Sequence, residues 1–203
     1  MITMSGEEQT KDVINIDMDY FDNVVLENAG EYSYQRVDDF LPKEIFRDIQ
    51  SLLLNGDQNQ IMPWYYRQGM ADFEDTEGFL FGNDIINRGV IPDNNLFLDI
   101  ATPIISRLPM RQLIRMKVNC HPRQTLRGSP NYPPCRFHTD MKEDHTVAIL
   151  SINTCNGYTE FEDGTQLKSI ENSLVIFNGN IKHRSMGQTD SNIRVNININ
   201  FQQ

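Results

Sequence analysis

The sequence predicts a mainly β protein, a barrel or sandwich of short strands, with N-terminal helices packed on one outer face. Three observations lead to this fold class. From residue 112 onward, apolar residues recur at every second position, which is the period of a half-buried strand. Turn signals such as Asn156-Gly157 and Asp163-Gly164 separate these runs. Ahead of residue 112, two stretches carry their apolar residues at helical spacing.

Length and composition predict a single globular domain. The chain has 203 residues, of which 39% are hydrophobic and 23% charged, so it can build a substantial core. Its net charge of −10 argues against a nucleic-acid binder, which would present a basic face. No N-terminal secretory signal and no run long enough to cross a bilayer are visible, so we expect a soluble cytoplasmic protein without a membrane partner.

The first 111 residues are predicted to support the strands and to face the substrate. Residues 1–11 are polar and predict a flexible tail, and residues 12–203 predict the domain itself. We interpret residues 12–26 as a loose strand. A helix is predicted to begin near Pro42, to place Ile45, Ile49, Leu52 and Leu53 on one face, and to end near Asn55-Gly56.

The next segments mix aromatic and acidic residues. The aromatic cluster at residues 62–66 is interpreted as a strand packing on the core, with a substrate-facing wall as the alternative. Residues 71–95 are acidic and contain glycine, so we expect an irregular segment that contacts the substrate. A second helix is predicted over residues 93–108, with a kink at Pro103.

The core strands of the predicted barrel follow from residue 112. Alternation over residues 114–121, an apolar run over 145–153, a short run over 174–177 and alternation over 193–201 predict four strands. In the last of these, the isoleucines face one side. Arg194, Asn196, Asn198 and Asn200 then face the other side, where a polar ligand would lie.

A candidate metal site combines His138 and Asp140 with a later histidine. His138 and Asp140 are two positions apart, so on one strand their side chains would point to the same face. His183 is the favoured third ligand over His121 and His145, because only His183 is followed by a suitably placed Arg194. Two histidines and one carboxylate form the facial set of non-haem Fe(II) sites. A surface histidine beside a turn carboxylate is the alternative interpretation of the His-x-Asp pair.

The three cysteines are predicted to be free thiols. The sequence has an odd number of cysteines and no Cys-x-x-Cys pair, so it does not suggest a disulfide framework; the three are Cys120, Cys135 and Cys155. Cys135 precedes His138 by three positions and could face either the site or the core. We favour the core.

The ordered set of residues resembles a known family. His138-x-Asp140, then His183, then Arg194 is similar to the Fe(II)- and 2-oxoglutarate-dependent oxygenases, in particular to prolyl-hydroxylase-like members from viruses of marine cyanobacteria. The resemblance spans residues 115–201. It also includes the segments Asn153-Thr-Cys-Asn-Gly-Tyr158, Phe161-Glu-Asp-Gly164, Asn172-Ser-Leu-Val-Ile-Phe177 and Lys182-His183.

The resemblance implies a fold, an activity and a set of cofactors. The fold is a double-stranded β-helix, a cupin-like jelly roll, over residues 112–203. The activity is hydroxylation of a C–H bond, in a prolyl or other residue of a protein, coupled to oxidative decarboxylation of 2-oxoglutarate to succinate and CO2. The cofactors are Fe(II), 2-oxoglutarate and O2, with ascorbate as a supporting reductant. A viral origin would place the protein in the cytoplasm of the host cell.

The resemblance also assigns roles to residues. His138, Asp140 and His183 would hold the iron and form the catalytic centre. Arg194 would bind the far carboxylate of 2-oxoglutarate, where collagen-type prolyl hydroxylases tend to have lysine. A surface arginine paired with an acid such as Asp190 is the alternative for Arg194. Asn119, Asn196 and Tyr132 are further candidates for cofactor contacts, with ordinary polar strand and turn positions as the alternative.

Other functions remain open at this stage. A non-catalytic jelly-roll module could use the same ligands to bind nickel, zinc or manganese. A small-molecule hydroxylase would share the same cofactor site. A nucleic-acid demethylase is disfavoured by the acidic composition. The substrate and the oligomeric state do not follow from the sequence.

Overall fold

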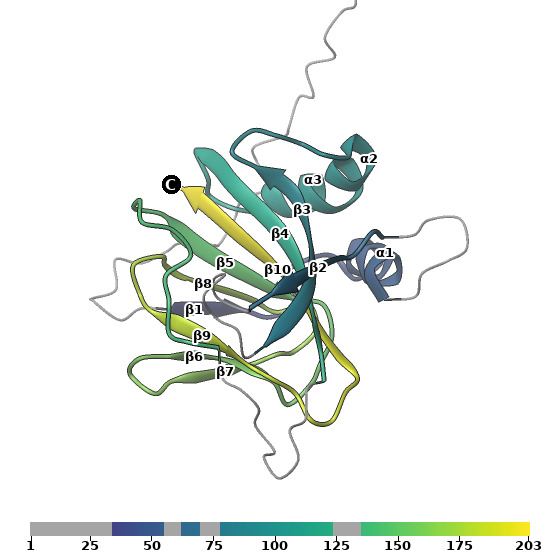
Figure 1. Cartoon of the computed structure of the whole chain (residues 1–203). Coiled ribbons are helices and arrows are strands. Elements are labelled where there is room, and N and C mark those ends of the chain that lie inside the picture. The colour runs from purple at the N-terminus through teal and green to yellow at the C-terminus, as the bar shows by residue number, and fades with distance from the viewer. Residues whose placement is uncertain (1–33, 55–61, 70–77, 124–134) are drawn as a thin grey trace, which may run out of the picture.

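Two antiparallel β-sheets face each other, and the helices lie beside the larger sheet (Figure 1). The computed structural model describes residues 34–54, 62–69, 78–123 and 135–203. The predicted tail and the predicted loose strand over residues 12–26 lie outside these described residues. Two facing sheets with helices on the outside of one confirm the predicted jelly-roll class.

The large sheet has seven strands in the order β1-β8-β5-β10-β4-β3-β2. Their bounds are β1 Tyr34–Val37, β2 Tyr65–Gln68, β3 Phe79–Asn87, β4 Gln112–Pro122, β5 Thr146–Ser151, β8 Leu174–Asn178 and β10 Ile193–Gln202. The small sheet has the order β7-β6-β9, with β6 Tyr158–Phe161, β7 Gln166–Lys168 and β9 His183–Met186. An isolated bridge between His138 and His183 attaches one more extended segment to β9.

The alternation in β10 fixes which side chains face the space between the sheets. Val195, Ile197, Ile199 and Phe201 are completely buried on the helix side. The intervening polar residues therefore face the small sheet. β4 pairs with β10 so that Asn119 lies opposite Asn196 and His121 lies opposite Arg194. Two neighbouring central strands thus present a polar surface toward the small sheet.

The first predicted helix is present as α1 (Lys43–Leu54), which buries Phe46, Ile49 and Leu53. The predicted placement of Ile45 on the buried face was wrong, because this side chain is 36% exposed. Phe46, one position further, takes its place against the core, so the buried face is rotated by one residue from the predicted one.

The second predicted helix is present but interrupted. Asp93 caps α2 (Asn94–Leu96), which continues as a π-helical turn η2 (Phe97–Ala101) and then as α3 (Thr102–Ile105). The N–H of Thr102 donates to the carbonyl of Phe97, five residues back. Pro103 has no N–H to donate, so the wider turn occurs where the regular hydrogen bonding is already lost.

The helices cover the outer face of the large sheet, as predicted. Ile100, Ile104 and Leu108 from the second helical segment join Phe46 and Ile49 from α1 in one cluster with the buried residues of β4 and β10. A second, smaller cluster lies between the two sheets, formed by Val147, Ile149, Phe161, Val175, Phe177 and Ile181. The smaller cluster fills only part of that space, and the rest is the polar pocket described below.

Two predictions about connecting segments were wrong. Residues 71–95 were expected to be irregular, but β3 occupies residues 79–87. A bulge near Asp84 breaks its alternation, which is why its pattern does not resemble a strand. Asn156-Gly157 was expected to close a hairpin. It instead joins β5 in the large sheet to β6 in the small sheet.

The prediction of a turn at Asp163-Gly164 was confirmed. Asp163-Gly164 connects the paired strands β6 and β7, and Gly164 adopts a positive φ of 86°. The aromatic cluster at residues 62–66 was interpreted as a strand that packs on the core. The strand is present as β2, and Met62 before it is buried, but Tyr65 and Tyr66 on β2 are exposed, so the predicted packing was wrong for these two side chains. None of the helices in the described residues is long and apolar enough to span a membrane.

Candidate metal centre

Three side chains converge between the two sheets. The Nε2 atoms of His138 and His183 each lie 3.7 Å from Oδ1 of Asp140, and the three residues form a group that could hold one metal ion. Two atoms that contact one ion at about 2.1 Å each can be no more than about 4.2 Å apart. Both measured separations therefore fit a shared ion.

The backbone brings the two histidines together directly. His183 begins β9, and its N–H and carbonyl pair with the carbonyl and N–H of His138 at 3.0 Å each. The prediction that His138 and Asp140 share a regular strand was wrong, since only this isolated bridge is formed. One bridge suffices to place the His138 ring beside the His183 ring, with centroids 4.9 Å apart.

Both histidines are oriented with Nε2 toward the site. Nδ1 of His138 lies 2.9 Å from the carbonyl of Arg136, and Nδ1 of His183 lies 3.2 Å from the carbonyl of Ile181. A carbonyl only accepts, so each Nδ1 carries the proton and each Nε2 presents a lone pair. Burial lowers the pKa of His183 from its ordinary value, which favours the neutral form that a metal requires.

Asp140 is held as an ionised carboxylate. The side-chain amides of Asn198 and Asn200 donate to Oδ2 at 2.9 and 2.8 Å, and Arg115 lies 3.5 Å from the same oxygen. Burial alone would raise the pKa of Asp140. The positive charge that His183 carries when it is protonated, the charge of Arg115 and the two amide hydrogen bonds outweigh burial and lower the pKa of Asp140 to about 2. The other oxygen, Oδ1, is left facing the histidines.

The other two histidines do not join this group. His145 is buried, and its Nδ1 donates to the carbonyl of Glu143 at 2.7 Å. His121 lies further along the pocket beside Arg194, where burial and the neighbouring cation lower its pKa to about 3. Tyr132, a predicted cofactor contact, lies outside the described residues.

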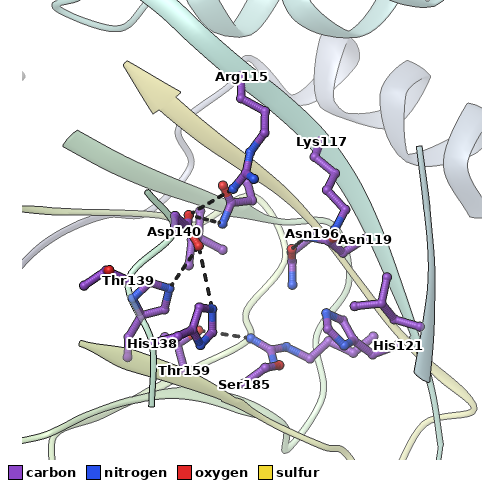
Figure 2. A pocket seen from close by; sticks show the side chains of 15 residues that line it. Arg115, Lys117, Asn119, His121, His138, Thr139, Asp140, Thr159, Ser185 and Asn196 are labelled. Carbon is purple, nitrogen blue, oxygen red and sulfur yellow. Dashed lines mark hydrogen bonds and ion pairs between the residues drawn. The ribbon is translucent and has the colours of Figure 1, made fainter. Parts of the chain in front are cut away.

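A polar pocket extends from the three side chains across β4 and β10 (Figure 2). Its walls come from both sheets and from the segment around His138. The lining residues are Leu80, Arg115, Lys117, Asn119, His121, His138, Thr139, Asp140, Ile149, Thr159, His183, Ser185, Arg194, Asn196 and Asn198. The predicted residues Arg194, Asn119 and Asn196 therefore lie in the same pocket as the candidate metal ligands.

Arg194 is a buried cation without an anionic partner. It is 2% exposed, and its terminal nitrogens donate to Ser185 Oγ at 2.8 Å, to Thr159 Oγ1 at 3.2 Å and to two backbone carbonyls. Within the described residues no carboxylate lies at ion-pair distance, and its buried Nε has no partner. Burial lowers its pKa to about 10, so it remains charged at neutral pH. The alternative of a surface arginine paired with Asp190 does not apply, because Asp190 instead accepts from the Asn156 N–H.

Gly157 makes room for the Arg194 side chain. A Cβ at Gly157 would lie 3.0 Å from Cδ of Arg194 and 3.1 Å from the carbonyl oxygen of Met186. The glycine that was expected to form a hairpin turn is thus used for close packing beside the buried guanidinium.

Asn119 and Asn196 face each other across β4 and β10. The amide of Asn119 donates to Oδ1 of Asn196 at 3.2 Å, while Oδ1 of Asn119 has no partner within the described residues. Cys135 is 1% exposed, as favoured for a core position, although its Sγ also lies 3.6 Å from Nδ1 of His138.

Several residues that hold the site together were not assigned a role from the sequence. Arg115 and Asn200 hold Asp140, while Ser185 and Thr159 hold Arg194. The alternation in β10 predicted that Asn200 lies on the polar face, and the alternation in β4 could have marked Arg115 in the same way, but the pattern does not say that both would contact Asp140. No sequence signal marks Ser185 and Thr159, because they belong to the other sheet and their partner depends on how the sheets face each other.

The donor set fits an iron ion and a dicarboxylate. Two neutral imidazoles and one ionised carboxylate on one side of a pocket suit a facial Fe(II) site. The buried guanidinium of Arg194 has no anionic partner, and its Nε–H, which has no acceptor among the described residues, can donate to a carboxylate. The same pocket therefore contains donors for the metal and for one end of a dicarboxylate.

Comparisons with solved structures find the same fold. A prolyl-4-hydroxylase from Pseudomonas putida aligns with a TM-score of 0.56 at 14% identity, over 85% of this chain and 94% of that one. A prolyl hydroxylase from Trichoplax adhaerens, solved with a peptide fragment of hypoxia inducible factor, aligns with a TM-score of 0.57 at 12% identity, over 83% of each chain. A viral collagen prolyl hydroxylase from Paramecium bursaria Chlorella virus-1, solved with 2-oxoglutarate, aligns with a TM-score of 0.50 at 8% identity, over 85% and 97%.

No protein-family model matches this chain, and no curated protein sequence does either. At identities below 15%, the structural likeness establishes the fold. The chain thus has the jelly-roll fold of the prolyl hydroxylases and related 2-oxoglutarate and Fe(II) oxygenases, which is the fold that the sequence resemblance implied.

Proposed function

We propose that this protein is an Fe(II)- and 2-oxoglutarate-dependent dioxygenase that hydroxylates a C–H bond of its substrate. The observation that carries the proposal is Arg194, a buried cation with no carboxylate partner among the described residues, in the same pocket as His138, Asp140 and His183. A structural metal site alone would leave the burial of this cation uncompensated.

Each proposed metal ligand is prepared by a neighbour. His138 and His183 would bind through Nε2, because backbone carbonyls hold both Nδ1 protons. Asp140 would bind through Oδ1, because Asn198 and Asn200 occupy Oδ2. Bound iron with 2-oxoglutarate would supply O2 activation coupled to decarboxylation of 2-oxoglutarate to succinate and CO2.

The far carboxylate of 2-oxoglutarate would bind Arg194. The guanidinium is already fixed by Ser185 and Thr159, so little side-chain freedom is lost when the carboxylate binds. Ser185 Oγ accepts from Arg194 and can direct its own hydroxyl proton to the same carboxylate. Asn119 and Asn196 line the same pocket as Arg194 and the proposed metal ligands and are candidates for further contacts with the cosubstrate.

A prolyl or other residue in a protein is the proposed substrate. Support comes from the Trichoplax adhaerens structure of the same fold, which contains a peptide fragment. A small molecule hydroxylated at the same centre is the competing substrate class, and a screen of peptides against small metabolites for stimulated succinate formation separates the two.

An anaerobic titration with Fe(II) and then 2-oxoglutarate tests the proposal. Chelation of 2-oxoglutarate to iron produces a visible charge-transfer band. We expect the band in the wild-type protein, loss of iron binding in His183→Ala, and retained iron binding without the band in Arg194→Met at matched 2-oxoglutarate concentration. Arg88→Met is the matched control, since Arg88 is 70% exposed on the surface.

The outcomes of the titration separate the two functions considered from the sequence. Iron binding without any band in the wild-type protein would contradict 2-oxoglutarate chelation and would favour a non-catalytic metal-binding module. An unchanged band in Arg194→Met would contradict the role of Arg194 and would leave its burial to be explained otherwise.

A further inference from the structure

Besides Arg194 and Arg115, the pocket is lined by a third cation, Lys117, which the proposed cofactors do not use. It lies on β4 between Arg115 and Asn119 and reaches into the pocket across from His138 and Thr139 (Figure 2). Its side chain runs over Gly82 of the neighbouring β3, where a Cβ would lie 3.0 Å from Cε of Lys117. The missing side chain at Gly82 therefore leaves the space that Lys117 occupies.

Two cations near Lys117, Arg115 in the pocket and Arg67 on β2 beside it, each lie close to a carboxylate. Arg115 lies 3.5 Å from Asp140 and also donates to Asn200 at 2.9 Å. Arg67 of β2 lies 3.3 Å from Asp84. For the half-buried ammonium of Lys117, neither a hydrogen bond nor an ion pair is present within the described part of the chain.

The surroundings of Lys117 are positive. Burial, followed by the charges of Arg67 and Arg115, lowers the pKa of Lys117 to about 8, and Asp84 and Asp140 counter this only in part. The whole chain carries a net charge of −10, so this local excess of positive charge runs against the average of the molecule. Positive charge concentrated in a pocket attracts an anion.

When iron and 2-oxoglutarate are counted as bound, the excess of positive charge around Lys117 remains. Bound 2-oxoglutarate brings two negative charges, of which Arg194 offsets one. Iron and Asp140 together carry one net positive charge and offset the other. Asp84 is engaged by Arg67. Arg115 and Lys117 then remain without a counter-charge, because the Asp140 carboxylate that faces Arg115 has already been counted with the metal.

We propose that Lys117 forms a second anion-binding position in this pocket, which binds a carboxylate of the substrate beside the metal centre. The inference rests on the proposed function, since it counts iron and 2-oxoglutarate as already bound. It assigns a substrate class, an acidic peptide side chain or a small carboxylic acid, and makes Lys117 a specificity-determining residue.

The test uses full-length protein loaded with Zn(II) in place of iron and saturated with 2-oxoglutarate, so that no turnover occurs and Arg194 is occupied. The probes are N-acetyl-aspartate N-methylamide and its neutral counterpart, N-acetyl-asparagine N-methylamide. Binding is followed through the amide NMR signals of Gly82 and Lys117. The variants are Lys117→Met and, as the matched control, Lys168→Met on the exposed side of β7.

We expect saturable shifts at Gly82 with the aspartate probe and roughly tenfold or greater weakening with the asparagine probe. Lys117→Met is expected to remove this preference, and Lys168→Met to keep it. Equal binding of the two probes to the wild-type protein, or an aspartate preference that survives Lys117→Met, would overturn the proposal. The comparison of the aspartate and asparagine probes uses only the wild-type protein, so it tests the proposal even if Lys117→Met does not fold.

Two further observations complete the test. An acidic peptide that binds more than about tenfold tighter than the capped aspartate would identify a peptide as the source of the carboxylate, and equal affinity would identify a small acid. The 2-oxoglutarate titration that precedes the probes follows the Asn196 and Arg194 amides. Failure at that step contradicts the proposed function itself, whereas failure at the probe step contradicts only Lys117.

Discussion

Arg194 illustrates how a single buried side chain can point to the chemical class of a ligand. Placing a guanidinium at 2% exposure without a carboxylate is unfavourable, and four neutral acceptors satisfy only its terminal nitrogens. The arrangement becomes favourable once an anion enters the pocket, because a charge-assisted pair then replaces the lost hydration. Under the proposed function, the surroundings of Arg194 are thus organised for the ligand-bound state.

His121 allows a prediction about pH at the same scale. Burial, followed by the charge of Arg194, lowers its pKa to about 3, so the unfolded chain takes up a proton below pH 6.5 while the folded protein does not. The contribution of His121 to stability is therefore complete above pH 6.5 and decreases as the pH falls toward 3. Between pH 6.5 and 5 the loss amounts to about 2 kcal/mol.

The variant His121→Gln isolates this effect. Urea unfolding of metal-free protein at pH 7 and pH 5 should show a smaller loss of unfolding free energy for the variant, by about 2 kcal/mol. An equal loss in both proteins would show that His121 is protonated in the folded state near its ordinary pKa.

At the scale of elements, β10 serves both the core and the site. Its isoleucines pack against the helices, while Arg194 and Asn198 on its other face line the pocket and Asn200 on the same face donates to Asp140. Any shift in register by one residue would exchange these two faces. The ten register pairs with β4 therefore hold the site and the core in place together.

Asn198 gives a prediction for this element. Asn198→Ala removes one of the two amide hydrogen bonds to Oδ2 of Asp140 and leaves all three proposed ligands in place. We expect metal affinity, measured by Co(II) titration, to fall roughly 10-fold to 100-fold. Asn192→Ala, on the exposed residue just before β10, should leave the affinity unchanged. Equal affinities for Asn198→Ala and wild type would show that the amide does not orient the carboxylate.

The turn after β8 gives a second prediction for an element. Gly179 packs directly on the His145 ring, so a Cβ at this position would overlap the imidazole. Gly179→Ala is therefore expected to lower the unfolding free energy by about 1–3 kcal/mol. In a His145→Ala background the same substitution should be nearly neutral, because the overlapping atoms are gone. A similar loss in both backgrounds would refute the steric explanation.

At the scale of the whole molecule, the sheets enclose a positive pocket within an acidic protein. Saturation with metal and 2-oxoglutarate should stabilise the fold, by about 2.7 kcal/mol at a ligand concentration 100 times the dissociation constant. For a chain of this length this corresponds to a rise in melting temperature of roughly 5–10 °C.

Chelation of the metal tests whether the two ligands share one site. With EDTA present, 2-oxoglutarate is expected to lose most of its stabilising effect, because it then binds only through Arg194. Scanning calorimetry with Co(II), with 2-oxoglutarate, with both and with EDTA measures these contributions. A 2-oxoglutarate effect that is independent of the metal would contradict a shared site.

The sequence predicted those parts of the fold where one face is buried. The alternation in residues 193–201 identified both the core side of β10 and the pocket side with Arg194, because a half-buried strand requires that pattern. Alternation did not predict β3, because Gly82 and Asp84 occupy the side of this strand that faces the pocket and a bulge interrupts the two-residue period. It also failed at Asn156-Gly157, since a local turn signal does not determine which sheet the next strand joins.

The candidate ligands were accessible from the sequence, whereas their supporting residues mostly were not. His138, Asp140 and His183 stand out by residue type and order. The roles of Asn200 and Arg115 depend on strand register, and those of Ser185 and Thr159 depend on how the two sheets face each other. Such contacts between distant segments have no local sequence pattern.

The most direct test of the account is the fate of labelled oxygen. Purified protein would be supplied with Fe(II), ascorbate and 2-oxoglutarate under heavy-isotope O2, and the succinate would be analysed by mass spectrometry. The account predicts succinate that carries one labelled oxygen atom, and no succinate above background from His183→Ala. Iron-loaded protein that binds 2-oxoglutarate yet forms no labelled succinate, with or without added peptides and small acids, would contradict an oxygenase and leave a binding module.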